Sequence, residues 1–149
     1  MRWYAKLKPE LVCELYLEHD NPESRKLLAM LRGGTNRLRI ETGRWKNIPV
    51  EQRTCEICLS CDQVEDEAHF LLDCGVYNVV RERMFDEIFQ RTGHQLDVRL
   101  MKDNREWMMD TLIGHGLVDY RVEVLKAVMR YVVRASRIRK QYSGEKEVD

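Results

Sequence analysis

The sequence predicts a mainly α-helical protein with a small zinc-stabilised Cys-Cys-His-Cys knuckle embedded among its helices. Apolar residues recur at helical spacing in most segments that are long enough to form an element. The 149 residues suffice for one ordinary domain. Three of the cysteines and one histidine, spaced over 20 residues in the middle of the chain, together make a full ligand set for one zinc ion.

Residues 1–34 are predicted to form a pair of helices. The first covers about residues 9–18, where apolar side chains fall at helical spacing. Asn21 then suits the N-cap of the second helix and Pro22 its first position. The glycine pair at 33–34 would end that helix and release the chain into a loop.

Residues 78–142 are predicted to form a helical C-terminal part, followed by a disordered tail at 143–149. The apolar spacing indicates three helices, over about residues 76–89, 104–114 and 119–141. The last helix carries a broad apolar stripe that begins at Val122. We expect all parts of the chain to share one compact domain.

The composition and the absence of targeting and catalytic motifs limit the classes of protein to which this chain could belong. No apolar run is long enough to span a bilayer, and the first residues do not resemble a secretory signal, so we expect an intracellular protein, nuclear or cytoplasmic, whose five cysteines are thiols or ligands. Walker, Rossmann, G-x-S-x-G and H-E-x-x-H signatures are absent, as is the paired aspartate of a polymerase. No catalytic activity is therefore expected.

The net charge is zero, but the charges are unevenly distributed. Residues 32–54 hold six basic and two acidic residues, a local sum of +4. Residues 55–74 hold six acids and no lysine or arginine, a local sum of −6. The predicted zinc segment is thus acidic and directly follows a basic one.

Residues 35–77 are predicted to form a basic segment followed by the zinc knuckle, and the basic part, residues 35–53, is the candidate nucleic-acid-binding segment. Their basic side chains cannot all be buried, and an indole between two cations suits stacking on a nucleic-acid strand. The alternative for Trp45 is a place in the core. The candidate residues are Arg37, Arg39, Arg44, Trp45, Lys46 and Arg53. A second basic group at the end of the last helix, usually only a solvated face, is a secondary candidate for phosphate contact: Arg134, Arg137, Arg139 and Lys140.

The spacing C-x2-C-x10-H-x4-C points to a structural zinc ion held by Cys55, Cys58, His69 and Cys74. Two residues between cysteines let both sulfurs point the same way, and a short helix could present the second pair. Protein side chains fill all four positions, which indicates a structural and not a hydrolytic metal. Cys58 and Cys61 form another C-x-x-C pair, so the spacing alone leaves the first pair open.

The motifs of this region resemble the C-terminal end of LINE-type (non-LTR) retrotransposon reverse transcriptases. The resemblance covers residues 31–77: L-R-I-E-T-G-R at 38–44, Pro49, the first C-x-x-C, E-D-E-A-H-F-L-L-D-C at 65–74, and Tyr77. The final helix, 124–139, is similar less specifically. The resemblance favours Cys55 and Cys58 over Cys61 as ligands, and it places Arg39 and Arg44 at the family's basic positions.

The resemblance implies a zinc-stabilised module that holds element RNA or target DNA downstream of a polymerase. The family's endonuclease and polymerase domains have no counterpart in these 149 residues. We therefore expect a truncated or repurposed piece that cannot copy RNA by itself. An alternative expectation is a structural or protein-interaction module that docks a basic partner on the acidic knuckle, because an acidic surface repels phosphate.

Overall fold

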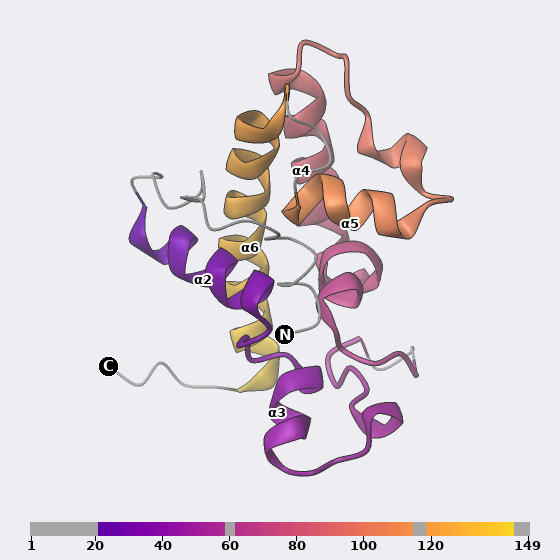
Figure 1. The fold of residues 1–149 in the computed structure, drawn as a ribbon. Helices are drawn as coiled ribbons and strands as arrows, with labels where there is room; N and C mark the ends of the chain where they lie inside the picture. The colour runs from indigo at the N-terminus through magenta and orange to yellow at the C-terminus, as the bar shows by residue number, and fades with distance from the viewer. Residues whose placement is uncertain (1–20, 59–61, 115–118, 145–149) are drawn as a thin grey trace.

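The computed structural model describes residues 21–58, 62–114 and 119–144. A long central helix, α6 (Arg121–Ser143), packs against α2 (Pro22–Gly33), α4 (Asn78–Arg91) and α5 (Arg105–Ile113). We call these four helices the helical frame. Figure 1 shows α2 on one side of α6 and α4 and α5 on the other, with the short helix α3 (Arg39–Trp45) near the C-terminal end of α6.

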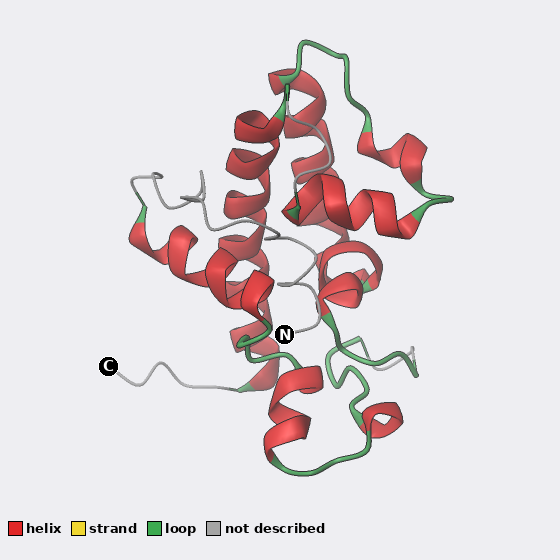
Figure 2. Cartoon of the chain, viewed as in Figure 1, coloured by secondary structure: helices red, strands yellow, loops and turns green. Residues whose placement is uncertain are grey.

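Short helical turns lie within the connections between these helices. They are the 3-10 turns η2 (Val50–Gln52), η4 (Gly75–Tyr77) and η5 (Val98–Met101), and a π-helical turn η3 (His69–Asp73). Within the described residues, extended backbone is paired only at the antiparallel bridge between Thr54 and Val64 (Figure 2). The prediction of a mainly helical fold is confirmed.

One apolar core runs through the helical frame. Its centre consists of side chains that are almost completely buried, among them Leu28, Ile88, Leu112, Ile113, Val128 and Tyr131. The core extends into the cysteine-histidine segment through Ile57, Phe70 and Leu71. None of the helices described is long and apolar enough to cross a membrane.

Local signals located the helix ends well. The Asn21 side chain accepts a hydrogen bond from the Ser24 N–H at 3.2 Å, and α2 ends at Gly34 in the left-handed conformation. Asn104 caps α5 by accepting from the Trp107 N–H at 3.0 Å. The predicted helix at 9–18 lies outside the described residues.

Two details differ from the predictions. Val122, expected on the apolar stripe, is 47% exposed, whereas Val124 and Leu125 on the buried face of α6 are 2% and 7% exposed. The turn η5 was not predicted, since four residues are too short for a periodic signal; it buries Val98 and Met101 after an Asp97 cap.

Candidate metal centre

The segment that carries the cysteines and histidine, residues 54–74, is here called the Cys-His loop. Its base is closed by backbone hydrogen bonds beside the Thr54–Val64 bridge. The Cys55 N–H donates to the Gln63 carbonyl at 2.9 Å, and the Glu65 N–H donates to the Arg53 carbonyl at 3.0 Å. These bonds hold the Cys55–Cys58 turn against the second half of the loop.

A π-helical turn arranges the second half of the loop. The Asp66 carboxylate accepts from the His69 N–H at 2.8 Å and starts the turn. The Cys74 N–H then donates to the His69 carbonyl, five residues earlier, at 2.9 Å. This wider turn brings His69 and Cys74 to the same side, as the sequence predicted for a short helix.

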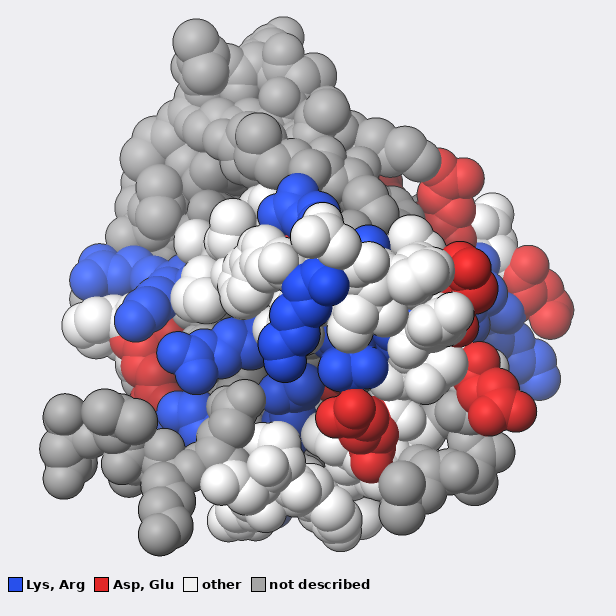
Figure 3. All heavy atoms as spheres, turned by 90° about the horizontal axis from the view of Figure 1, so that it is seen from below, with Lys and Arg blue, Asp and Glu red and all other residues white. Residues whose placement is uncertain are grey.

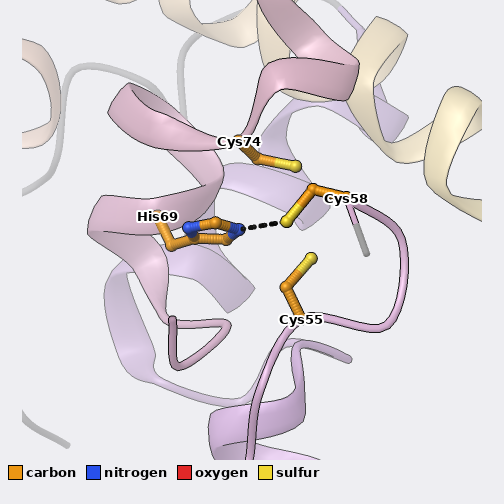
Figure 4. A group of neighbouring side chains, drawn as sticks. All are labelled: Cys55, Cys58, His69 and Cys74. Atoms are coloured by element: carbon orange, nitrogen blue, oxygen red, sulfur yellow. Dashed lines mark hydrogen bonds between the residues drawn. The ribbon is translucent and has the colours of Figure 1, made fainter. Parts of the chain in front are cut away.

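The four predicted ligands converge. The ligand atoms of Cys55, Cys58, His69 and Cys74 all lie within 4.8 Å of one another. A tetrahedral site with metal–sulfur bonds of about 2.3 Å needs sulfurs about 3.8 Å apart. Figure 4 shows the three sulfurs and the imidazole turned toward a common centre, with His69 Nε2 3.7 Å from Cys58 Sγ. These residues are close enough to hold one metal ion.

The imidazole is oriented by a residue that the sequence did not single out. His69 Nδ1 lies 3.0 Å from the Gln63 side-chain oxygen. A proton on Nδ1 that is donated to this oxygen leaves Nε2 free to bind a metal. No spacing rule marks Gln63, because its role depends on the backbone pairing that places it beside His69.

Two buried side chains of the helical frame hold the π-helical turn. Arg81 of α4 donates from Nε to the Leu71 carbonyl and from Nη2 to the Cys74 carbonyl, both at 2.8 Å. The Tyr131 hydroxyl of α6 donates to the Phe70 carbonyl. The carbonyls at the end of the turn, which the turn itself leaves unpaired, are thereby satisfied.

The two buried free thiols, Cys55 and Cys74, are coupled by a hydrogen bond. The hydrogen bond from Cys74 lowers the pKa of Cys55 to about 3, and the same bond together with burial raises the pKa of Cys74. Binding of one metal ion by all four side chains requires release of thiol protons.

Glu65 joins the loop to two basic segments that are far apart in the sequence. Its buried carboxylate accepts from the Arg39 backbone N–H at 2.7 Å. It also accepts from Nε and Nη2 of Arg139 on α6, at 2.8 and 3.1 Å. The start of α3 and the end of α6 therefore meet at one carboxylate.

The predicted nucleic-acid-binding residues divide into two groups. Arg53 has a structural position, because it donates to the carbonyls of Ile48 and Ile40 at 2.8 and 2.9 Å. Its side chain lies over Gly43, where a Cβ would come within 2.6 Å of Arg53 Cγ. Arg39 is half-buried, with Nη1 3.4 Å from Glu56.

The other four predicted residues, Arg37, Arg44, Trp45 and Lys46, are exposed. Trp45 is 60% exposed, so the structure does not place it in the core. Arg44 lies 2.8 Å from the buried Glu41 carboxylate and remains 53% exposed.

Most acids of the Cys-His loop are engaged within the molecule. Glu65 and Glu67 are buried, and Glu67 accepts from the Asn36 amide at 3.3 Å. Asp66 caps the His69 turn, and Asp73 forms a two-bond pair with Arg105 at 2.6 and 2.7 Å. The local charge sum of this segment therefore overstates the acidity of its surface.

Comparisons with known proteins find no match for this chain: no family model, no curated protein and no solved structure matches the sequence.

Proposed function

We propose that this chain is a zinc-binding module that binds nucleic acid, and that its role is binding and not catalysis. The observation that carries the proposal is the meeting of two basic segments at Glu65, directly beside the metal-binding side chains. We call the surface formed there the basic end. Its exposed basic residues are Arg37, Arg44, Lys46, Arg137 and Lys140, of which Arg44 pairs with Glu41 and Arg137 with Glu23.

Zinc suits the donor set better than other common cations. Three thiolates and one imidazole are soft or borderline ligands, which select zinc over magnesium or calcium. All four tetrahedral positions are filled by the protein, so the ion would have no open position for a substrate or a reactive water. We assign it a structural role: it fixes the first half of the Cys-His loop, and through Glu65 it fixes α3.

Phosphate is the ligand that suits the basic end. Figure 3 views the molecule from this end and shows lysine and arginine side chains gathered across its middle, with most of the acidic ones to one side. A surface of this sign attracts the nucleic-acid backbone and releases its counterions. Binding of this kind weakens steeply as salt is added.

The resemblance to the C-terminal end of LINE-type reverse transcriptases also favours nucleic-acid binding. Several motif residues that carry the resemblance have structural roles in this chain. Ile40 is buried, Glu41 pairs with Arg44, and Gly43 leaves the space that Arg53 occupies. We infer a module derived from such an element, with RNA or target DNA as its ligand.

Docking of a protein on the acidic knuckle has less support. That alternative needs a free acidic surface, whereas Glu65 and Glu67 are buried and Asp73 is paired with Arg105. The acids of the loop mainly hold the loop and neighbouring segments in place. They do not form the broad patch that a basic partner would recognise.

The test measures metal and nucleic acid separately. Elemental analysis of the reduced protein should find one zinc ion per chain. Fluorescence anisotropy should show binding to labelled single-stranded RNA or duplex DNA at low salt. In Arg37→Ala/Lys46→Ala, the log–log salt slope should decrease in magnitude by about 1.4–1.8, the share of two phosphate contacts.

The matched control is Arg83→Ala/Lys102→Ala, which removes two exposed cations outside the basic end. This variant should bind like the wild type. If wild-type protein bound neither nucleic acid, or if the two double variants lost affinity equally, the proposed function would be wrong.

A further inference from the structure

The C-terminal end of α3 presents an aromatic side chain to solvent. Trp45 is the last residue of the helix, lies between Arg44 and Lys46 in the sequence, and is 60% exposed. The chain then reverses at Asn47, whose φ of 55° is in the left-handed region. An exposed indole on a short anchored helix is typical of a binding surface, since tryptophan combines large contact area with few rotatable bonds.

A second exposed aromatic side chain lies at the same end of the molecule. Tyr142, in the last turn of α6, is 65% exposed. The start of α3 and the C-terminal end of α6 lie near each other in Figure 1. Glu65 joins them, because its carboxylate binds the Arg39 backbone and the Arg139 guanidinium.

Helix geometry places both aromatic residues close to this junction. Trp45 lies six residues after Arg39 on α3, a rise of about 9 Å. Tyr142 lies three residues after Arg139 on α6, a rise of about 4.5 Å. Exposed cations accompany each aromatic residue: Arg44 and Lys46 beside the first, and Lys140 beside the second.

We propose that the basic end binds single-stranded nucleic acid, with unpaired bases stacked on Trp45 and Tyr142 and the phosphates held by the neighbouring cations. This inference rests on the proposed function and names its ligand. A stacked duplex hides the faces of its bases, whereas a single strand offers them to aromatic side chains. Aromatic residues alternating with cations are the recurring arrangement of single-strand binding surfaces.

The test compares a labelled oligothymidylate with a mixed-sequence duplex of the same length at one salt concentration. The wild type should prefer the single strand. Trp45→Ala should weaken single-strand binding roughly 5- to 150-fold, the range of one lost stacking contact, and should leave duplex binding nearly unchanged. Trp45→Phe should recover much of the affinity, and Tyr142→Ala should give a loss in the same range.

Trp107→Ala is the matched control, because Trp107 is also an exposed tryptophan, 46% exposed, but lies on α5. It should bind both ligands like the wild type. The tryptophan variants should retain one zinc ion, which separates loss of stacking from loss of the fold.

Two results would overturn the inference while leaving the proposed function intact. One is equal affinity for duplex and single strand. The other is a Trp45→Ala variant that binds the single strand as tightly as the wild type. Failure of the wild type to bind any nucleic acid would remove both proposals. Binding to anionic lipid vesicles that depends on Trp45, with no such dependence for oligonucleotides, would instead assign the exposed indole to a membrane surface.

Discussion

In the helical frame, α6 buries apolar side chains against α2, α4 and α5. The first half of the Cys-His loop, residues 54–66, is instead held by hydrogen bonds, a buried charge and the candidate metal-binding side chains. Leu28, Leu112 and Val128 are fully buried in the frame. Among the described residues of 54–66, Ile57 is the large apolar side chain buried in the core, Val64 packs against the core while partly buried, and Glu65 is the buried charge. The frame therefore has its own hydrophobic stabilisation, and we expect this part of the loop to depend on a bound metal.

This difference matters for function because the start of α3 is anchored on the loop by two backbone hydrogen bonds. The Arg39 and Ile40 N–H groups both donate to Glu65, one to its carboxylate and one to its carbonyl. Loss of the metal should thus release α3 and Trp45 while the frame stays folded. Each of the following experiments tests one side of this contrast.

The largest effect is expected from removing a ligand in the first half of the loop. Cys55→Ser should abolish tight zinc binding, which contributes on the order of 10 kcal/mol in small structural sites. Hydrogen exchange should become fast at the N–H groups of Cys55, Glu65 and Ile40, whereas amides in α4 and α6 keep their protection. Elemental analysis and exchange mass spectrometry under reducing conditions measure both outcomes.

Cys61→Ser is the control for that experiment, and it also decides between the two C-x-x-C pairs. It should retain one zinc ion if Cys55 and Cys58 are the ligands. Simultaneous loss of protection in the loop and the frame of Cys55→Ser would show that the two regions are not stabilised separately.

A cavity in the frame should give the opposite pattern. Leu112→Ala removes a fully buried side chain from α5 and should lower the free energy of unfolding by about 2–5 kcal/mol. The folded variant should still bind one zinc ion. Urea unfolding with parallel zinc determination measures both, and Leu100→Ala, at a position that is 81% exposed, should change stability by less than about 0.5 kcal/mol.

A residue that links the two regions should affect both. Arg81→Met keeps most of the apolar stem but removes the bonds to the Leu71 and Cys74 carbonyls, and should reduce stability by about 2–3 kcal/mol. Because Cys74 is then held less firmly, zinc should also be lost at a lower chelator concentration. Arg83→Met, at an exposed position on the same helix, should change neither quantity; an unchanged chelator profile in Arg81→Met would limit its role to the frame.

The parts of the molecule that the sequence predicted well depend on signals a few residues apart. The N-cap at Asn21 and the left-handed Gly34 bound α2 as expected, because a cap involves only neighbouring backbone groups. The convergence of the four candidate ligands also follows from local spacing. Each pair is separated by a single turn, and the turn geometry decides where the side chains point.

The features that could not be predicted from the sequence depend on contacts between residues that are far apart in the chain. Glu65 belongs to an acidic run, and nothing nearby in the sequence shows that it is buried against Arg139, 74 residues away. Arg53 belongs to a basic run, but it is used to hold the carbonyls of Ile40 and Ile48. The net charge of a sequence segment therefore does not give the charge of the surface that it forms, because some of its charged side chains are buried or paired in the folded protein.

The smallest effect concerns the aromatic cluster where the loop and the frame share a core. The Phe70 ring packs edge-on against Tyr77 and Tyr131, with centroids 5.1 and 5.7 Å apart. Burial raises the pKa of both tyrosines above the ordinary value of about 10. Below that pH both hydroxyls are protonated in the folded and unfolded chains, so they add no pH dependence.

Above about pH 10 the unfolded chain loses these protons while the folded chain keeps them, so stability should fall as pH rises, by about 1.4 kcal/mol per pH unit for each tyrosine. Tyr131→Phe should reduce this slope, and Tyr77→Phe/Tyr131→Phe should reduce it further. Urea unfolding at pH 8 and at about pH 11 measures the difference. If both variants kept the wild-type slope, the junction would be open to water. The loop and the frame would then meet through hydrogen bonds such as that from Tyr131 to Phe70, and not through a shared dry core.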